Sequence, residues 1–328
     1  MAALLEVKGL ETQFRVGKKT ITAVGGIDFT VGERETLAIV GESGSGKSVT
    51  ALSIMRLVPN PPGRVTGGEV VFGGEDLLRK TKAEMRDVRG NQISMIFQEP
   101  MTSLNPVYTI GNQLSETFRR HQKLGRKKAL ERSAEMLDRI GIPAAAERLG
   151  SYPHQLSGGM RQRVMIAMAL CCNPRLLIAD EPTTALDVTI QAQILDLIRQ
   201  LKERQEMSVL IITHDLGVVA EVAQRVVVMY GGMIMECSGA RELFLEPLHP
   251  YTRGLLASIP RMGTSRSKPL STIRGIVPDL SRLPEGCVFS PRCDSCAERC
   301  RRERPPMRDM PSGRSVRCWL YEGGGARG

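Results

Sequence analysis

One eight-residue stretch decides the fold class of this chain: Gly41-Glu42-Ser43-Gly44-Ser45-Gly46-Lys47-Ser48. It fits the pattern G-x-x-x-x-G-K-[ST], in which a glycine-rich loop binds phosphate groups. The residues before it, 36–40, form a short apolar run rich in strand-forming residues, and residues 48–55 predict a helix. Strand, glycine loop and helix follow in the order that the pattern requires, so a chance Gly/Ser turn is a poor explanation.

The chemistry of phosphate binding explains these residue types. Glycines let backbone N–H groups turn toward the phosphates without a Cβ in the way. The helix that begins at the end of the loop directs the positive end of its dipole at the same anion. Lys47 can reach the β- and γ-phosphates of a nucleoside triphosphate, and the Ser48 hydroxyl can ligate Mg²⁺.

Two later strand ends carry further candidate residues. The apolar run 176–179 predicts a strand that ends at Asp180 and Glu181. In nucleotide-binding sheets the carboxyl end of a strand meets the phosphate site. Asp180 would hold the Mg²⁺ shell, and Glu181 would orient or deprotonate the attacking water. The run 209–212 also predicts a strand, and His214 just after it could contact a γ-phosphate.

A second glycine-rich helix start lies far from the phosphate loop. Ser157 is a natural N-cap residue for a helix that begins with Gly158 and Gly159. Because glycine has no side chain, the backbone N–H groups at the positive end of this helix stay accessible to an anion. Because it is so distant from the first loop in sequence, we interpret it as a second phosphate contact, provided by another subunit.

Strand and helix patterns alternate along most of the chain. Apolar runs, helical periodicity and Pro/Gly content predict strands at 4–14, 21–31 and 226–229, a loop at 58–68, helices at 109–149, 188–202 and 217–223, and a linker at 261–268. This alternation favours an α/β fold with a mainly parallel sheet covered by helices.

Composition excludes several classes of protein. With 328 residues the chain has room for about two domains at ~150 residues each. Its net charge of +10 fits a nucleic-acid surface or an anionic-lipid surface, and 4% aromatic residues argue against base stacking on nucleic acid. The longest apolar run, Val164–Cys172, has nine residues, whereas a membrane-spanning helix needs ~20. The start of the chain lacks a secretory signal, so we expect a cytosolic location.

Five of the eight cysteines lie close together in the tail, at Cys287, Cys293, Cys296, Cys300 and Cys318. In the cytosol, clustered cysteines favour metal or redox chemistry over disulfides. Four of these five could bind zinc or an iron–sulfur cluster, and the spacing alone does not select the set. The other three, Cys171, Cys172 and Cys237, lie in apolar stretches and are interpreted as small buried residues.

Taken together, these motifs resemble the ATP-binding cassette (ABC) transporter ATPases over about residues 4–260. The resemblance implies the fold of their nucleotide-binding domain: a P-loop NTPase core, an antiparallel β subdomain and a helical subdomain at about 99–170. It implies that Phe14 stacks on the adenine of ATP and that the loop, the following Val49, Gln98 and Asp180 also contact ATP. It implies that Ser48, Gln98 and Asp180 bind Mg²⁺. It assigns the signature motif to Leu156, Ser157, Gly158, Gly159 and Met160, the dimer-linking loop to Ala185-Leu186-Asp187, the catalytic base to Glu181 and the switch histidine to His214.

In this family two cassettes sandwich two ATP molecules, each between one subunit's phosphate loop and the other subunit's signature. The resemblance therefore implies a dimer, usually of two different cassettes. It also implies two membrane permeases, a periplasmic or lipid-anchored binding protein, and a peripheral location on the cytoplasmic face of the inner membrane. A cassette that acts on nucleic acid is not expected. A non-catalytic regulatory module is also disfavoured, because the catalytic positions are present.

Further stretches are similar to the dipeptide and oligopeptide importers. These are the loop with Val49 and Thr50, residues 97–106, residues 249–252 and the tail residues 286–293. Nickel, glutathione and other short peptides are alternative solutes in this subfamily. The resemblance also implies a [4Fe–4S] cluster, with zinc as the alternative, on Cys287, Cys293, Cys300 and Cys318. Cys296 would be a spare thiol or a replacement ligand. We expect an ATPase domain at 1–260 and a cysteine-rich regulatory or metal-binding extension at 261–328.

Overall fold

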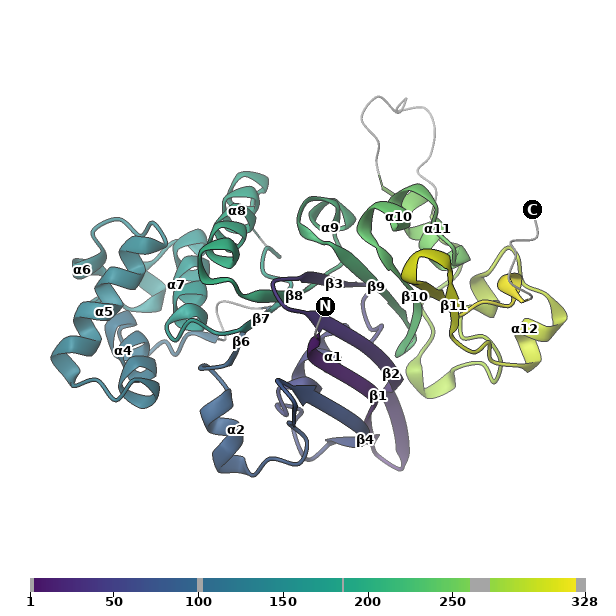
Figure 1. Cartoon of the computed structure of the whole chain (residues 1–328), viewed down its shortest axis with the longest axis horizontal. Helices are drawn as coiled ribbons and strands as arrows, with labels where there is room; N and C mark the ends of the chain where they lie inside the picture. Colours follow the sequence, from purple (N-terminus) through teal and green to yellow (C-terminus); the bar gives the residue numbers. More distant parts are fainter. Residues whose placement is uncertain (1–2, 99–102, 185, 260–271, 323–328) are drawn as a thin grey trace. The chain divides into compact units, whose positions relative to one another are not determined.

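The computed structural model describes residues 3–98, 103–184, 186–259 and 272–322. The predicted linker at 261–268 lies outside the described residues. The chain divides into two compact units (Figure 1). The first comprises Gly32–Glu35 and Arg79–Ile212, and the second comprises Ala2–Val31, Thr36–Leu78 and Thr213–Gly328.

Three parallel strands form the sheet portion of the first unit. β7 pairs with β6 on one side and β8 on the other. Their bounds are Ile93–Ile96 for β6, Leu176–Asp180 for β7 and Ser208–Thr213 for β8. Every residue of β7 and β8 is buried. Continuous apolar runs are typical of parallel strands covered on both faces, so the strands predicted at 176–179 and 209–212 are confirmed.

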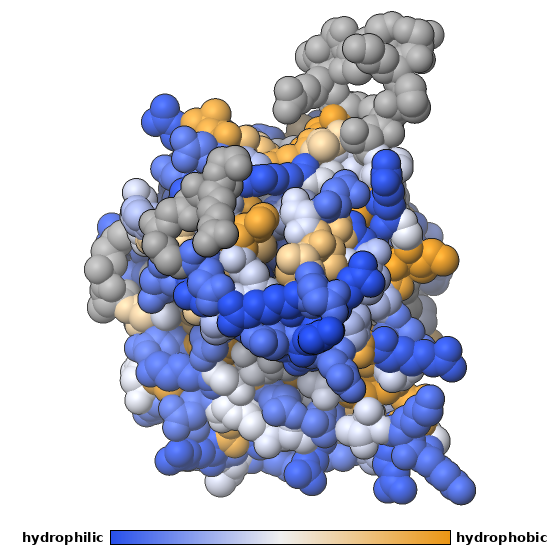
Figure 2. Space-filling model, turned by 90° about the vertical axis from the view of Figure 1, so that its right-hand side faces the viewer, coloured by the Kyte–Doolittle hydropathy of each residue, from blue (hydrophilic) through white to orange (hydrophobic). Residues whose placement is uncertain are grey.

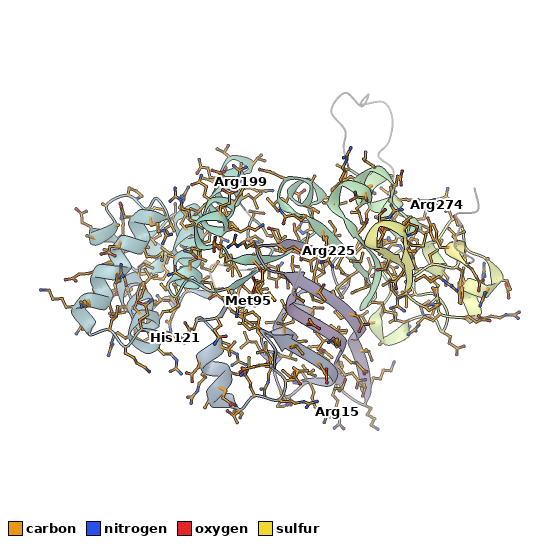
Figure 3. All side chains as sticks on the ribbon, in the orientation of Figure 1. Arg15, Met95, His121, Arg199, Arg225 and Arg274 are labelled. Carbon is orange, nitrogen blue, oxygen red and sulfur yellow. The ribbon has the colours of Figure 1, made fainter. Side chains whose placement is uncertain are left out.

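Helices supply the rest of the first unit. They are α2 (Lys82–Val88), α4 (Ile110–His121), α5 (Arg126–Arg139), α6 (Ala145–Arg148), α7 (Gly158–Leu170) and α8 (Val188–Gln205). The region predicted as helical at 109–149 is therefore three helices, α4 to α6, which lie side by side (Figure 1). The last turn of α4 carries Arg119 and Arg120, which complement the negative end of the helix dipole. His121 ends the helix (Figure 3).

An antiparallel sheet occupies the N-terminal part of the second unit. Its strand order is β2-β1-β4-β5, with β1 at Ala3–Val16, β2 at Lys19–Gly32, β4 at Gly63–Phe72 and β5 at Glu75–Asp76. The strands predicted at 4–14 and 21–31 are confirmed. The loop predicted at 58–68 is wrong for its second half, because β4 begins at Gly63 and pairs with β1. Pairing with β1 stabilises the strand despite its glycines. Gly68 has a positive φ and lies where the register of β1 and β4 shifts.

A second group of strands in this unit includes part of the tail. Its order is β11-β12-β10-β9-β3, in which β3 (Thr36–Val40) and β9 (Arg225–Tyr230) are parallel. β10 (Met233–Gly239) runs antiparallel to β9, and β12 (Arg314–Val316) pairs with β10. The remaining elements are α1 (Lys47–Ile54), α9 (Leu216–Val222), α10 (Ala240–Leu245), α11 (Pro250–Ala257), α12 (Glu298–Arg302) and β11 (Arg308–Met310). The last strands of the chain thus belong to the same sheet as β3, the strand before the phosphate loop.

Few charged side chains are buried. Hydrophilic residues cover most of the face seen in Figure 2, with only small hydrophobic areas between them. Across the described ranges, the buried charged residues are Lys47, Asp180, Glu236 and Arg292. Such residues are almost never fully buried unless they are paired, so these four positions have specific surroundings.

In the described part of the chain, no helix combines the length and the apolar character needed to cross a membrane.

Glu236 and His249 form a buried polar contact near the C-terminal strands. The two carboxylate oxygens of Glu236 accept the backbone N–H groups of Leu248 at 2.9 Å and His249 at 2.8 Å. His249 caps α11, because its Nδ1 accepts the N–H of Tyr251 at 3.0 Å. The imidazole is 1% exposed, and this burial lowers the pKa of His249 to about 3. His249 is therefore neutral in the folded protein at neutral pH.

We expect the free energy of unfolding to fall as the pH is lowered from 7 to 5. In the unfolded chain His249 takes up a proton near pH ~6.5, which the folded protein does not accept until about pH 3. Between these values the residue contributes a slope of up to about 1.4 kcal/mol per pH unit. His249→Asn keeps a capping acceptor without titrating, so urea unfolding should show a shallower pH dependence. His154→Asn, at an exposed position, is the control. If the free energy of unfolding depends on pH equally in His249→Asn and wild type, His249 is not the titrating group.

Candidate functional site

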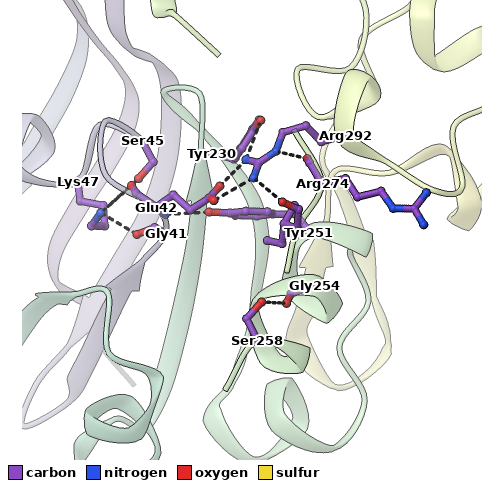
Figure 4. Close-up of polar contacts among 11 residues, drawn as sticks. Gly41, Glu42, Ser45, Lys47, Tyr230, Tyr251, Gly254, Ser258, Arg274 and Arg292 are labelled. Carbon is purple, nitrogen blue, oxygen red and sulfur yellow. Dashed lines mark hydrogen bonds and ion pairs between the residues drawn. The ribbon is translucent and has the colours of Figure 1, made fainter. Parts of the chain in front are cut away.

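The phosphate loop joins β3 to α1 in the second unit (Figure 4). Two of its glycines lie against neighbouring backbone. A Cβ on Gly41 would come within 2.2 Å of the Met229 carbonyl oxygen, and a Cβ on Gly46 within 2.5 Å of the Ala23 carbonyl oxygen. Their φ angles of 153° and 100° are values that residues with a Cβ rarely adopt. The loop can therefore follow this path only with glycine at both positions.

Lys47 reaches back over the loop from the first turn of α1. Its buried Nζ donates to the carbonyl oxygen of Gly41 at 2.8 Å and to that of Glu42 at 3.0 Å (Figure 4). α1 begins after Gly46, and no side chain caps its start. An ammonium group and the positive end of a helix dipole thus lie at the same turn of the chain. This arrangement suits a phosphate group.

The acidic pair predicted after residues 176–179 lies at the carboxyl end of β7 in the first unit. Asp180 is its last residue and is buried. Glu181 follows with a left-handed φ of 47°, and its N–H donates to the Ile212 carbonyl oxygen at 2.8 Å. A non-glycine residue in this region carries backbone strain, which persists only where the surroundings impose it. The turn is thereby fixed immediately beyond the strand.

Two side chains orient the Glu181 carboxylate. Its Oε2 accepts the Thr184 hydroxyl at 2.8 Å and the Gln98 side-chain amide at 3.1 Å. The structure thus brings together Gln98 and Glu181, two residues that the resemblance assigned to one site. Thr184 received no role from the sequence, because a threonine three residues after an acid carries no distinctive signal. Both hydrogen bonds reach the same oxygen, so they fix the orientation of the Glu181 carboxylate.

The predicted signature helix begins as expected. Ser157 is the N-cap of α7, and its hydroxyl accepts the Met160 N–H at 3.3 Å. Gly159 packs against α8, where a Cβ would lie 3.2 Å from Cγ2 of Ile190. Asp187 caps α8 by accepting the Ile190 N–H at 2.9 Å. The signature start and the predicted dimer-linking loop are therefore neighbours. Ala185 lies outside the described residues.

The remaining predicted residues lie in the second unit. His214 is exposed directly after β8, and the following Asp215 caps α9 through the N–H groups of Gly217 and Val218. Phe14 lies on β1 opposite Gly63, where a Cβ would come within 2.6 Å of its ring. The candidate residues thus form two groups, one in each unit. The loop, Phe14 and His214 belong to one group, and Gln98, Asp180, Glu181, the signature and Asp187 belong to the other.

The iron–sulfur prediction is wrong for this structure. Among the residues described here, which include all five tail cysteines, no three His, Cys, Asp or Glu side chains are grouped so that they could hold a metal ion. Burial also raises the pKa of Cys287, Cys293 and Cys318 to about 11 each. Burial thus favours the neutral thiol over the thiolate at these three positions. The same finding gives zinc no support.

Several proteins are similar to this chain over almost its whole length. A putative peptide import ATP-binding protein of Brucella melitensis is 54% identical, with 97% of each chain covered. An oligopeptide transport ATP-binding protein of Bacillus subtilis is 53% identical, with 99% of each covered. The family model for ABC transporters matches residues 24–184.

The chain belongs to the ABC transporter family.

Solved structures agree with this assignment. This ABC protein resembles a dimeric ATP-binding cassette in a post-hydrolysis state bound to ADP and phosphate, with a TM-score of 0.65, 27% identity, and coverage of 72% of this chain and 99% of that one. A second family model, the C-terminal region of oligopeptide/dipeptide transporters, matches residues 235–300. The ABC protein is therefore an ATPase that uses ATP and Mg²⁺. Ser48, Gln98 and Asp180 each offer an oxygen atom, the type of donor that Mg²⁺ prefers.

We expect Gly41→Ala to weaken ATP binding by at least about tenfold. The added Cβ would collide with the Met229 carbonyl oxygen and push the loop off its path. Equilibrium binding of a non-hydrolysable ATP analogue measures the effect. Gly150→Ala is the matched control, because its Cβ would make only an ordinary contact of 3.6 Å with the Glu147 carbonyl oxygen. Unchanged affinity in a folded Gly41→Ala protein would show that the loop tolerates the methyl group.

Proposed function

We propose that the chain is the ATP-hydrolysing subunit of an importer for dipeptides or oligopeptides. One observation carries this proposal. The named relatives are peptide, oligopeptide and dipeptide transport ATP-binding proteins, at 50–54% identity over at least 96% of this chain. Their similarity includes the C-terminal region matched at 235–300. That region lies beyond the match to the general ABC model at 24–184, so it favours a peptide importer over other ABC proteins.

The proposed mechanism assigns each group a task in hydrolysis. Phe14 stacks on the adenine, the loop binds the phosphates, and His214 contacts the γ-phosphate. Glu181, oriented by Thr184 and Gln98, accepts a proton from the attacking water. The water oxygen bonds to the γ-phosphorus, and the bond to the β-phosphate oxygen breaks, which releases ADP and phosphate. Ser48, Gln98 and Asp180 would hold Mg²⁺, which would supply positive charge against the phosphates.

We further propose the assembly in which this chemistry is used. The signature residues 156–160 would complete the ATP site of a second cassette, a paralogue with which this chain would form a heterodimer. Support comes from the capped, glycine-rich start of α7 and from the dimeric form of the similar cassette. The dimer would act on two permeases that receive peptides from a periplasmic or lipid-anchored binding protein. The chain would lie on the cytoplasmic face of the inner membrane.

We expect Glu181→Gln to bind ATP normally but to hydrolyse it at least about a hundredfold more slowly. The amide keeps the shape of the side chain and cannot accept the proton, and general-base removal costs about 10²–10⁴-fold. Steady-state ATPase assays and gel filtration with ATP measure the effect, and the variant should accumulate as a closed dimer. Glu203→Gln, at an exposed position of α8, is the control. Normal turnover in Glu181→Gln would remove the role given to this residue.

Peptide uptake tests the proposed function itself. We expect deletion of the encoding gene to abolish uptake of labelled di- or oligopeptides, with rescue by the wild-type gene and not by Glu181→Gln. Labelled nickel and glutathione are measured in parallel. Unchanged peptide uptake in the deletion strain would reject the peptide importer, and loss of nickel or glutathione uptake instead would reassign the solute.

A further inference from the structure

Glu42, in the phosphate loop, is held by residues that follow it by more than 200 positions in sequence. Its backbone N–H donates to the Tyr251 hydroxyl at 2.8 Å. Its carboxylate forms a two-point ion pair with Arg292, from Nη1 to Oε2 at 2.6 Å and from Nη2 to Oε1 at 3.0 Å (Figure 4). All three residues belong to the second unit, so the contact lies within one compact body. The tail of the chain thus touches the loop directly.

The surroundings of Arg292 hold its guanidinium in one orientation. Its Nε donates to the Arg274 carbonyl oxygen at 2.9 Å, and Nη1 also lies 3.4 Å from the Tyr230 hydroxyl (Figure 4). The Arg292 side chain is 5% exposed, compared with 24% for Glu42. Tyr230 and Tyr251 pack on each other and on Phe289, three residues before Arg292. A buried guanidinium with this many partners has little freedom, so it fixes the carboxylate that it binds.

The charge of Glu42 matters because of where it lies. The Glu42 carbonyl oxygen accepts a hydrogen bond from the Lys47 ammonium at 3.0 Å. The Glu42 carboxylate therefore belongs to a residue that contacts the lysine of the loop directly. A negative charge at this position opposes the binding of a triphosphate, which itself carries several negative charges. Arg292 offsets that charge within a partly buried site, where solvent screens it less than at the surface.

We propose that Arg292 is a positioning residue for ATP binding, which neutralises Glu42 and holds the phosphate loop in its binding conformation. Through this ion pair the C-terminal region sets the affinity of the loop for nucleotide. The inference depends on the loop binding ATP and not on the solute that is transported. It gives the region at 235–300 a task within the ATPase itself, in addition to any contact with partners.

The test uses the purified full-length chain and AMP-PNP with Mg²⁺ as the probe. Arg292→Met should weaken AMP-PNP binding about tenfold, equivalent to about 1.4 kcal/mol. It should raise the KM for ATP with little change in kcat, because the residue acts before the chemical step. Adding Glu42→Gln to Arg292→Met should restore part of the lost affinity, because no unpaired carboxylate then remains, whereas the hold on the loop is still missing.

Two further variants make the outcome decisive. Arg274→Met is the matched control, because its side chain is 86% exposed and lies in the same part of the fold. Arg292→Lys keeps the charge without the two-point geometry, so it should give an intermediate loss and replaces Arg292→Met if that variant fails to fold. An affinity for Arg292→Met or Arg292→Lys equal to that of Arg274→Met would overturn the proposal. So would a double variant that binds as weakly as Arg292→Met, because the contact would then serve the fold alone.

Discussion

Gly41 and Gly46 lie where the phosphate loop passes directly against the backbone of β9 and β2, and neither position has room for a Cβ. The other features of this site depend on that close approach. It sets the path of the loop, places Lys47 over the loop carbonyls and starts α1 with an uncapped, positive end. The eight-residue motif predicted the loop, but the backbone that leaves no room for a Cβ comes from the distant strands β9 and β2, and only the structure shows it.

Several helices begin among the candidate site residues, and their first turns differ in whether a side chain caps them. Ser157, Asp187 and Asp215 each cap a helix with a side-chain oxygen, so those turns are fixed by their own sequence. α1 instead begins at glycine without a side-chain cap. Glu181 instead follows a strand, in a strained turn whose backbone N–H bonds the Ile212 carbonyl oxygen and whose carboxylate bonds Thr184 and Gln98. Rigid turns of these kinds hold the candidate residues on strand and helix ends.

The tail shows where inference from a resemblance fails. The resemblance predicted a metal cluster on Cys287, Cys293, Cys300 and Cys318, yet no metal-binding group exists among the described residues. A metal site requires side chains that converge within bonding distance, and spacing along the chain does not state this. The same tail contributes β12 to the sheet of β9 and β10, and it contributes Arg292 to the phosphate loop.

The sequence by itself determined the strands before residues 41, 180 and 213, the phosphate loop, the capped start of α7 and the family. These features are local: a periodicity of side chains, a capping residue or a run of glycines specifies each of them within a few positions. Only the tertiary structure decided that residues 63–72 form a strand, that Thr184 and Gln98 orient Glu181, and that Arg292 binds Glu42 across 250 positions. Such contacts depend on pairing and packing between distant segments, for which a single sequence carries no local signal.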